Sequence, residues 1–148
     1  MGAERTFTLR EAEALLPVLQ DLLQTAMQAH QRVEEAEEEL QAHISRILLA
    51  GGVQSDPIRT SRLRAERDRS TQQLEDAVRE IAASGAQVKD LDLGLLDFPC
   101  LWKGNLVLLC WKLGEQGIHH WHGLQEGFAN RKPLDSSMDS ESGGGRVH

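Results

Sequence analysis

The sequence predicts an α+β fold, in which a long antiparallel helical hairpin packs with a small antiparallel β-meander. Two observations support this prediction: apolar residues recur with a helical period as far as about residue 84, and from residue 86 the pattern changes to short alternating segments separated by glycines. With 148 residues and 40% hydrophobic content, the chain fits one domain. We place that domain at 1–134, with the hairpin at about 8–84, the sheet at about 86–124 and a C-terminal segment to 134.

The first helix should begin near Leu9, because Thr8 and Glu11 have the spacing of a capping box. It should end at Gly51–Gly52, since glycine readily adopts the left-handed conformation that closes a helix. Pro17 lies inside this segment and should kink or break it. The residues expected on the seam follow a heptad repeat: Leu19, Leu23, Ala26, His30, Val33, Glu37, Leu40, Ile44 and Ile47.

The second helix should run from about Pro57 to Ser84, with Gly85 as its C-cap. Its expected seam residues are Leu63, Arg67, Ser70, Leu74, Ala77 and Ile81. Folding the chain about the short loop sets an acidic run, Glu34–Glu39, opposite a basic run, Arg62–Arg69. Ion pairing between the helices is the structural interpretation of both runs, and binding of RNA or an acidic partner by the arginines is the functional one. The polar seam residues are typical of positions that fix register or oligomeric state.

Charge and hydropathy exclude several functional classes. The net charge of -7 and the pI near 5.3 argue against nucleic acid as a partner, because sequence-independent binding normally needs a basic excess. The sequence has no apolar run near the ~20 residues that span a bilayer. Its N-terminus also lacks the apolar core of a secretory signal. We therefore expect a soluble, cytoplasmic protein without a membrane partner.

The central strands have a predictable register. A two-residue turn at Lys103–Gly104 would pair Trp102 with Asn105 and set Asp97 opposite Cys110. The other face then becomes almost wholly apolar and should meet the first helix; it carries Leu96, Phe98, Cys100, Trp102, Val107, Leu109 and Trp111. The two cysteines fall on opposite faces, so both should be free thiols.

The turn at Gly114–Gly117 leaves two registers open for the last strand. If Leu113 pairs with Ile118, the side chains of His120 and His122 point into the apolar face. With one more loop residue Cys110 pairs with His122, so that Asp97, Cys110, His120 and His122 share a face. Such residues can bind zinc or another transition metal, and Glu115 could complete the shell or act as an acid or base. A third hypothesis is a Cys110 nucleophile activated by His122.

Four motifs carry a family resemblance: "FTLREAEALLP", "GAQVKDLDLGLLDFP", "LCWKLGE" and "WHGLQEGFANRKPL". In this order and with these gaps, the chain resembles the bacterial family catalogued as domain of unknown function 2203, over roughly Phe7 to Leu134. The resemblance implies a hairpin joined to a small sheet, and it brings no activity or cofactor. It favours a polar cluster of Lys89, Asp97, Glu115 and Arg131 with Cys110 and His122, and it does not include His119 or His120.

The sequence therefore leaves two hypotheses for function. The first is an interaction or oligomerisation module, which would bind a second copy or a protein partner through the helical hairpin. The second is a metal or acid-base site centred on His122, Glu115, Asp97 and Cys110; the same polar residues also fit an ion network that joins the sheet to the C-terminal segment. Whether the protein is an enzyme stays open. The Ser- and Gly-rich tail, 135–148, should be disordered.

Overall fold

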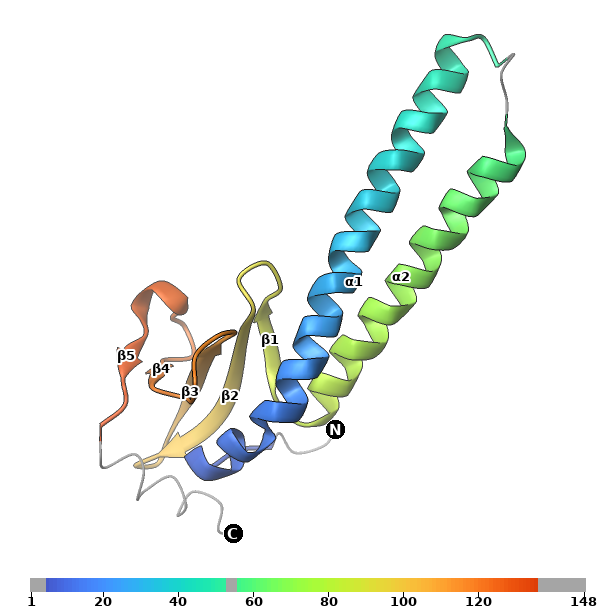
Figure 1. The fold of residues 1–148 in the computed structure, drawn as a ribbon. Helices are drawn as coiled ribbons and strands as arrows, with labels where there is room; N and C mark the ends of the chain where they lie inside the picture. Colours follow the sequence, from blue (N-terminus) through green and yellow to red (C-terminus); the bar gives the residue numbers. More distant parts are fainter. Residues whose placement is uncertain (1–4, 53–55, 136–148) are drawn as a thin grey trace.

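The computed structural model describes residues 5–52 and 56–135. Two long helices, α1 (Leu9–Leu49) and α2 (Pro57–Ala83), form an antiparallel hairpin whose outer half projects well beyond the sheet (Figure 1). The sheet is antiparallel, in the order β1-β2-β3-β4-β5. Its strands are β1 (Gln87–Asp90), β2 (Leu95–Trp102), β3 (Asn105–Lys112), β4 (His120–His122) and β5 (Lys132–Pro133), with the 3-10 helix η1 (Phe128–Asn130) before β5. This arrangement confirms the α+β prediction.

Two expectations need comment. The predicted sheet, at about 86–124, extends further along the chain, because the C-terminal segment returns as β5 to pair with β4. The tail predicted to be disordered lies, from residue 136 on, outside the described residues. None of the helices in the described part of the chain is long and apolar enough to cross a membrane.

The start of α1 is fixed by the predicted capping box. The Thr8 hydroxyl accepts from the Glu11 backbone N–H at 3.0 Å, and the Glu11 carboxylate accepts from the Thr8 N–H at 2.9 Å. Pro17 does not break the helix. The first turns run at an angle to the long remainder (Figure 1), which fits a kink at a residue that lacks the N–H for the Glu13 carbonyl.

The cap gives a direct test of this boundary. Thr8→Ala should lower the free energy of unfolding by about 1 kcal/mol, because the N–H of Glu11 loses its partner at a position that is only 8% exposed. Thr8→Ser, which keeps the hydroxyl, is the matched control and should cost much less. Urea denaturation measures both, and equal losses would show that packing of the threonine methyl group, rather than the cap, stabilises the helix start.

The hairpin seam follows the predicted repeat in its first half and departs from it in the second. Leu19, Leu23 and Ala26 are buried as expected. Further along, Ala36 and His43 are buried, whereas Glu37 is exposed, so the prediction of Glu37 on the seam is wrong. In its first half α1 is buried against the sheet. In its outer half it packs on α2, and the buried residues there, Ala29, Ala36 and His43, form a different stripe that keeps a seven-residue spacing.

The core lies between the first half of α1 and one face of the sheet. The predicted apolar face packs there: Leu96, Phe98, Cys100, Val107, Leu109 and Trp111 are buried against Leu9, Ala12, Leu16, Leu19 and Leu23. Lys103 and Gly104 have φ values of 52° and 78°, as a tight hairpin turn requires. The predicted pairs Trp102–Asn105 and Asp97–Cys110 are confirmed.

The register of β4 differs from both alternatives. Cys110 pairs with His120, and Leu108 pairs with His122, so the predicted pairs Leu113–Ile118 and Cys110–His122 are both wrong. The shift from the second alternative is two residues, and side chains two apart on a strand point to the same face. His120 and His122 therefore share the face of Cys110 and Asp97, as the second alternative expected.

Candidate functional site

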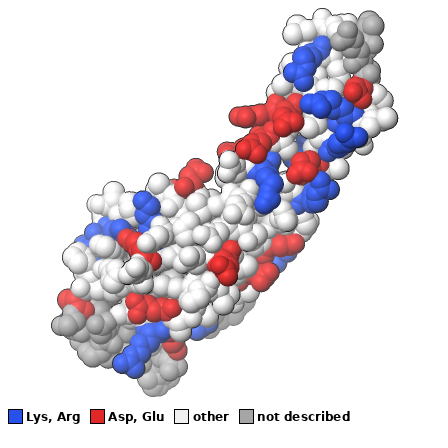
Figure 2. Space-filling view, in the orientation of Figure 1, with Lys and Arg blue, Asp and Glu red and all other residues white. Residues whose placement is uncertain are grey.

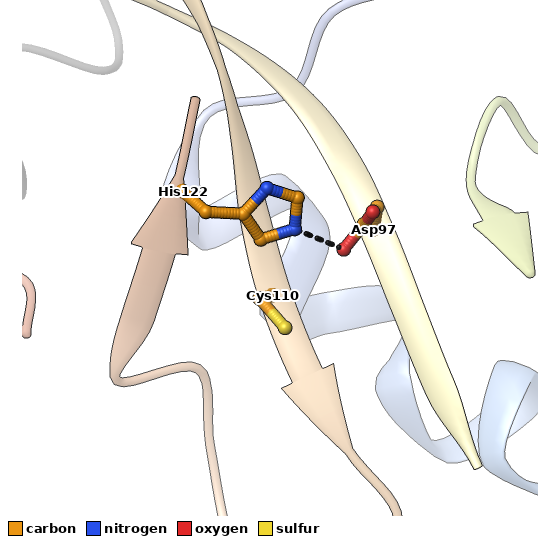
Figure 3. A group of neighbouring side chains, drawn as sticks. All are labelled: Asp97, Cys110 and His122. Carbon is orange, nitrogen blue, oxygen red and sulfur yellow. Dashed lines mark hydrogen bonds and ion pairs between the residues drawn. The ribbon is translucent and has the colours of Figure 1, made fainter. Parts of the chain in front are cut away.

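Asp97, Cys110 and His122 come together on the face of the sheet that points away from α1. They lie on three adjacent strands, β2, β3 and β4 (Figure 3). One carboxylate oxygen, the thiol sulfur and one ring nitrogen all lie within 4.8 Å of one another. All three residues are at most 1% exposed, so this polar group, the buried triad, lies inside the protein.

The strand register explains which histidine completes the buried triad. Asp97, Cys110 and His120 form a row across the sheet, and His122 lies two residues further along β4. The His122 side chain reaches from β4 across β3, so that its Nε2 lies 3.0 Å from Asp97 Oδ1 (Figure 3). His120 shares the face, but it is not part of the group.

The hydrogen bonds of His122 fix one of its protons. Its Nδ1 lies 2.9 Å from the Gly123 carbonyl oxygen, and because a carbonyl only accepts, Nδ1 must carry a hydrogen. The contact between Nε2 and the Asp97 carboxyl group then needs one further proton, which lies on the nitrogen or on the oxygen. His122 and Asp97 are therefore either an imidazolium with a carboxylate or a neutral imidazole with a carboxylic acid.

Burial dominates the acidities in the buried triad. It raises the pKa of Asp97 above its usual value, although the charge and hydrogen bond of His122 and the charge of Lys89 oppose the shift. Burial, followed by the charge of Asp97, raises the pKa of the Cys110 thiol to about 11. Cys110 is therefore a thiol at neutral pH, and both nitrogens of His122 are engaged elsewhere. This arrangement does not favour a Cys110 nucleophile activated by His122, and that hypothesis stays a prediction.

A second polar group, Glu115 with Arg131, adjoins the first. The guanidinium group binds the carboxylate through two hydrogen bonds of 3.2 and 2.7 Å, and it lies over the Phe128 ring at 4.4 Å. Burial raises the pKa of the Cys110 thiol, and the charge of Arg131 acts against that shift. The Glu115 carboxylate accepts from the Lys112 N–H as well; burial acts to raise its pKa, but these bonds lower it overall. Arg131 therefore joins the C-terminal segment to Glu115 and acts on Cys110 through its charge.

The remaining candidates lie at the margin of the site. Lys89 is exposed on β1 and contributes only its charge. Glu115 lies outside the buried triad because it pairs with Arg131. His120 is half-buried, and its Nδ1 is buried without a hydrogen-bond partner among the described residues. Burial, together with the charge of Arg131, lowers the pKa of His120, so its ring favours the neutral form that binds metals.

Two functional residues were missed at the level of sequence. Gly123 supplies the carbonyl that orients His122, and Glu126 holds Gly123 in place by accepting from its N–H at 2.7 Å. The Glu126 N–H donates in return to the Gly123 carbonyl at 3.0 Å, and Lys132 of β5 donates to the Glu126 carboxylate at 2.6 Å. The sequence did contain a signal for this turn, because Gly123 directly follows His122 and Glu126 comes three residues later.

Comparison with known proteins identifies the family without an activity. No curated protein and no solved structure matches the chain. One family model, described as an uncharacterized conserved protein (DUF2203), matches residues 5–134. That range contains the hairpin, the sheet and every residue of the two polar groups. The chain therefore belongs to the DUF2203 family of uncharacterized conserved proteins.

Proposed function

We propose that the buried triad of Asp97, Cys110 and His122 binds a divalent transition metal, with zinc as the first candidate. The observation that carries the proposal is the convergence of an oxygen, a sulfur and a nitrogen donor within 4.8 Å at almost complete burial. Thiolate, imidazole and carboxylate are the ligands that zinc uses in proteins.

The orientation of His122 supports the same proposal. A metal-bound histidine usually donates its second ring N–H to a carbonyl or carboxylate, which fixes the tautomer and aims the other nitrogen at the metal. His122 has this arrangement, because Nδ1 donates to the Gly123 carbonyl and Nε2 points to the other two donors. The charge of Arg131, which acts to lower the pKa of Cys110 against the larger effect of burial, would stabilise the thiolate that coordination requires.

His120 is our candidate for the fourth ligand. Three protein donors are one fewer than closed structural zinc sites have. His120 pairs directly with Cys110 across β3 and β4, where neighbouring side chains on one face are about 5 Å apart at Cβ. Its Nδ1 is buried and has no hydrogen-bond partner in the described part of the chain, and coordination would satisfy it. A water ligand in this position is the alternative.

The test is zinc stoichiometry in protein made without an affinity tag. After chelation, reloading with zinc and gel filtration, the wild type should hold about one equivalent, and His122→Ala should hold little or none. His119→Ala is the matched control, because this neighbouring histidine is exposed and should keep the metal. Loss in His120→Ala would identify the fourth ligand, and full retention would assign that position to water. A wild type that stays empty under saturating zinc contradicts the proposal.

Cobalt gives an independent readout of the sulfur ligand. Cobalt(II) bound by a cysteine thiolate absorbs in the near ultraviolet through charge transfer from sulfur. Titration of the metal-free wild type with cobalt should produce this band, and Cys110→Ala should not. A band of equal strength in the variant would remove Cys110 from the ligand set.

A second candidate function belongs to the hairpin. We propose that its outer half, the arm (residues 34–49 and 57–70), is an interaction surface. The predicted ion pairing between the acidic and basic runs is absent among the described residues, since Arg67 and Arg69 pair with Asp68 and Glu66 of their own helix. In the part of the chain that the structure describes, Glu37, Glu38 and Arg64 take part in no ion pair, so charges of both signs remain for a partner to bind.

The buried free thiols, Cys100 and Cys110, also support a cytoplasmic location, where thiols stay reduced.

A further inference from the structure

The arm carries a groove with opposite charges on its two edges. Its α1 edge carries Glu37 and Glu38, and its α2 edge carries Arg64 and Arg67. Leu40 and Ile44 also line it and give it an apolar component. Figure 2 shows acidic side chains gathered on the α1 side of the outer arm, with basic ones beside them toward α2.

The charges on the groove edges are largely unmatched within the chain. Among the described residues, Glu37, Glu38 and Arg64 take part in no ion pair, and the Arg67 side chain bonds only to that of its neighbour Asp68, at 3.1 Å. Opposite charges that line one groove without meeting favour a partner that presents the same two charges in the reverse order. A second copy of this face is such a partner.

Symmetry decides how a second copy fits. If the twofold axis runs parallel to the arm, the α1 edge of each copy lies over the α2 edge of the other, so glutamates face arginines at the same height. If the axis crosses the arm at right angles, α1 lies over α1 and like charges meet. Building on the interaction role proposed for the arm, we infer that two copies pair through this groove with their arms parallel, as a four-helix bundle.

The end of the arm favours the same arrangement. Leu48, Leu49 and Ile58 are 71%, 88% and 71% exposed there, although leucine and isoleucine are normally buried. Parallel arms bring the two ends side by side, where Leu48, which lies one helical turn beyond the groove residue Ile44, can pack against its copy. An antiparallel pairing about the groove moves the ends apart and leaves the leucines in water. Charge and apolar exposure thus point independently to one orientation.

Charge reversal in the two edges tests the inference. Sedimentation velocity should show a wild-type dimer that weakens as salt is raised. Glu37→Arg with Glu38→Arg, and separately Arg64→Glu with Arg67→Glu, should each weaken the homodimer on the order of 100-fold, because like charges then meet. An equimolar mixture of the two variants should regain a dimer, since an all-positive groove then meets an all-negative one. Glu39→Arg, in the same run but outside the groove, is the control and should leave the dimer intact.

Three outcomes would overturn the inference. A wild type that is monomeric at every concentration removes the second copy. A dimer that tightens with salt indicates like-charge contact and removes the parallel orientation. A mixture that fails to associate removes the complementary edges. The broader proposal, that the arm is an interaction surface, has a separate test. It is overturned if the arm does not dimerise and if, in addition, the charge-reversed variants retain the same proteins from a cell extract as the wild type does.

Discussion

Asp97→Ala should lower the free energy of unfolding of the metal-free protein by about 3 kcal/mol. His122 is fully buried, and Asp97 Oδ1 is the partner of its Nε2. Without the carboxyl group, the ring keeps its bond to the Gly123 carbonyl but leaves a buried nitrogen unpaired. The loss should therefore exceed what a surface substitution costs, which is usually within about 0.5 kcal/mol. Chemical denaturation in the presence of a chelator measures it.

Asp97→Asn is the matched control for this prediction. A side-chain amide can donate to Nε2 of a neutral imidazole, so the variant should lose less than about 1 kcal/mol. The same variant lacks the anionic oxygen donor, so its zinc affinity should fall although the fold is retained. Equal destabilisation by alanine and asparagine would show that the negative charge, and not the hydrogen bond, is what the fold requires. Asp97→Asn thus separates the structural part of the buried triad from its proposed ligand role.

Cys110→Ala should weaken zinc binding by about 100-fold or more, because a thiolate is the strongest donor in the proposed set. Cys100→Ala is the matched control. It removes an equally buried thiol from the opposite face of the same sheet, and burial raises the pKa of both thiols to about 11. Competition with a chromogenic chelator measures the dissociation constants. Similar losses in both variants would indicate that the effect arises from packing.

The same titration has a defined pH dependence. Zinc binds the thiolate, whereas Cys110 in the metal-free protein is a thiol whose pKa of about 11 lies above neutral pH. Binding must therefore release this proton, and affinity should fall by about tenfold or more for each unit that the pH decreases below neutrality. The slope should be smaller in Cys110→Ala. A wild-type affinity that does not change with pH would remove the thiolate from the site.

The parts of the fold that local chemistry controls were predictable from the sequence. The capping box fixed the start of α1, and the turn at Lys103–Gly104 fixed the pairing of β2 with β3, including Asp97 opposite Cys110. The apolar face of that hairpin followed by alternation. These features depend on residues close together in sequence, and their patterns admit one conformation.

The register of β4 depended on contacts that local patterns do not contain. The turn before it is held from a distance, because the Glu13 carboxylate of α1 accepts from the Ile118 N–H at 3.0 Å. Within the turn, Glu115 is engaged by Arg131, which lies beyond β4. Sequence spacing could therefore limit the loop to a few lengths but could not choose among them. The prediction that Asp97, Cys110 and His122 share a face was nevertheless correct, because a shift of the strand register by two residues leaves each side chain on the same face.

The edges of the sheet have a consequence for behaviour at high concentration. One edge, β1, has four residues and an irregular register between Val88 and Asp90. The other described edge, β5, has two residues, and its Pro133 has no N–H to offer a neighbouring strand. Short, irregular or proline-containing edges are poor templates for a strand from another molecule. Strands from other molecules should therefore not add readily to either edge, and concentrated samples should resist fibril formation.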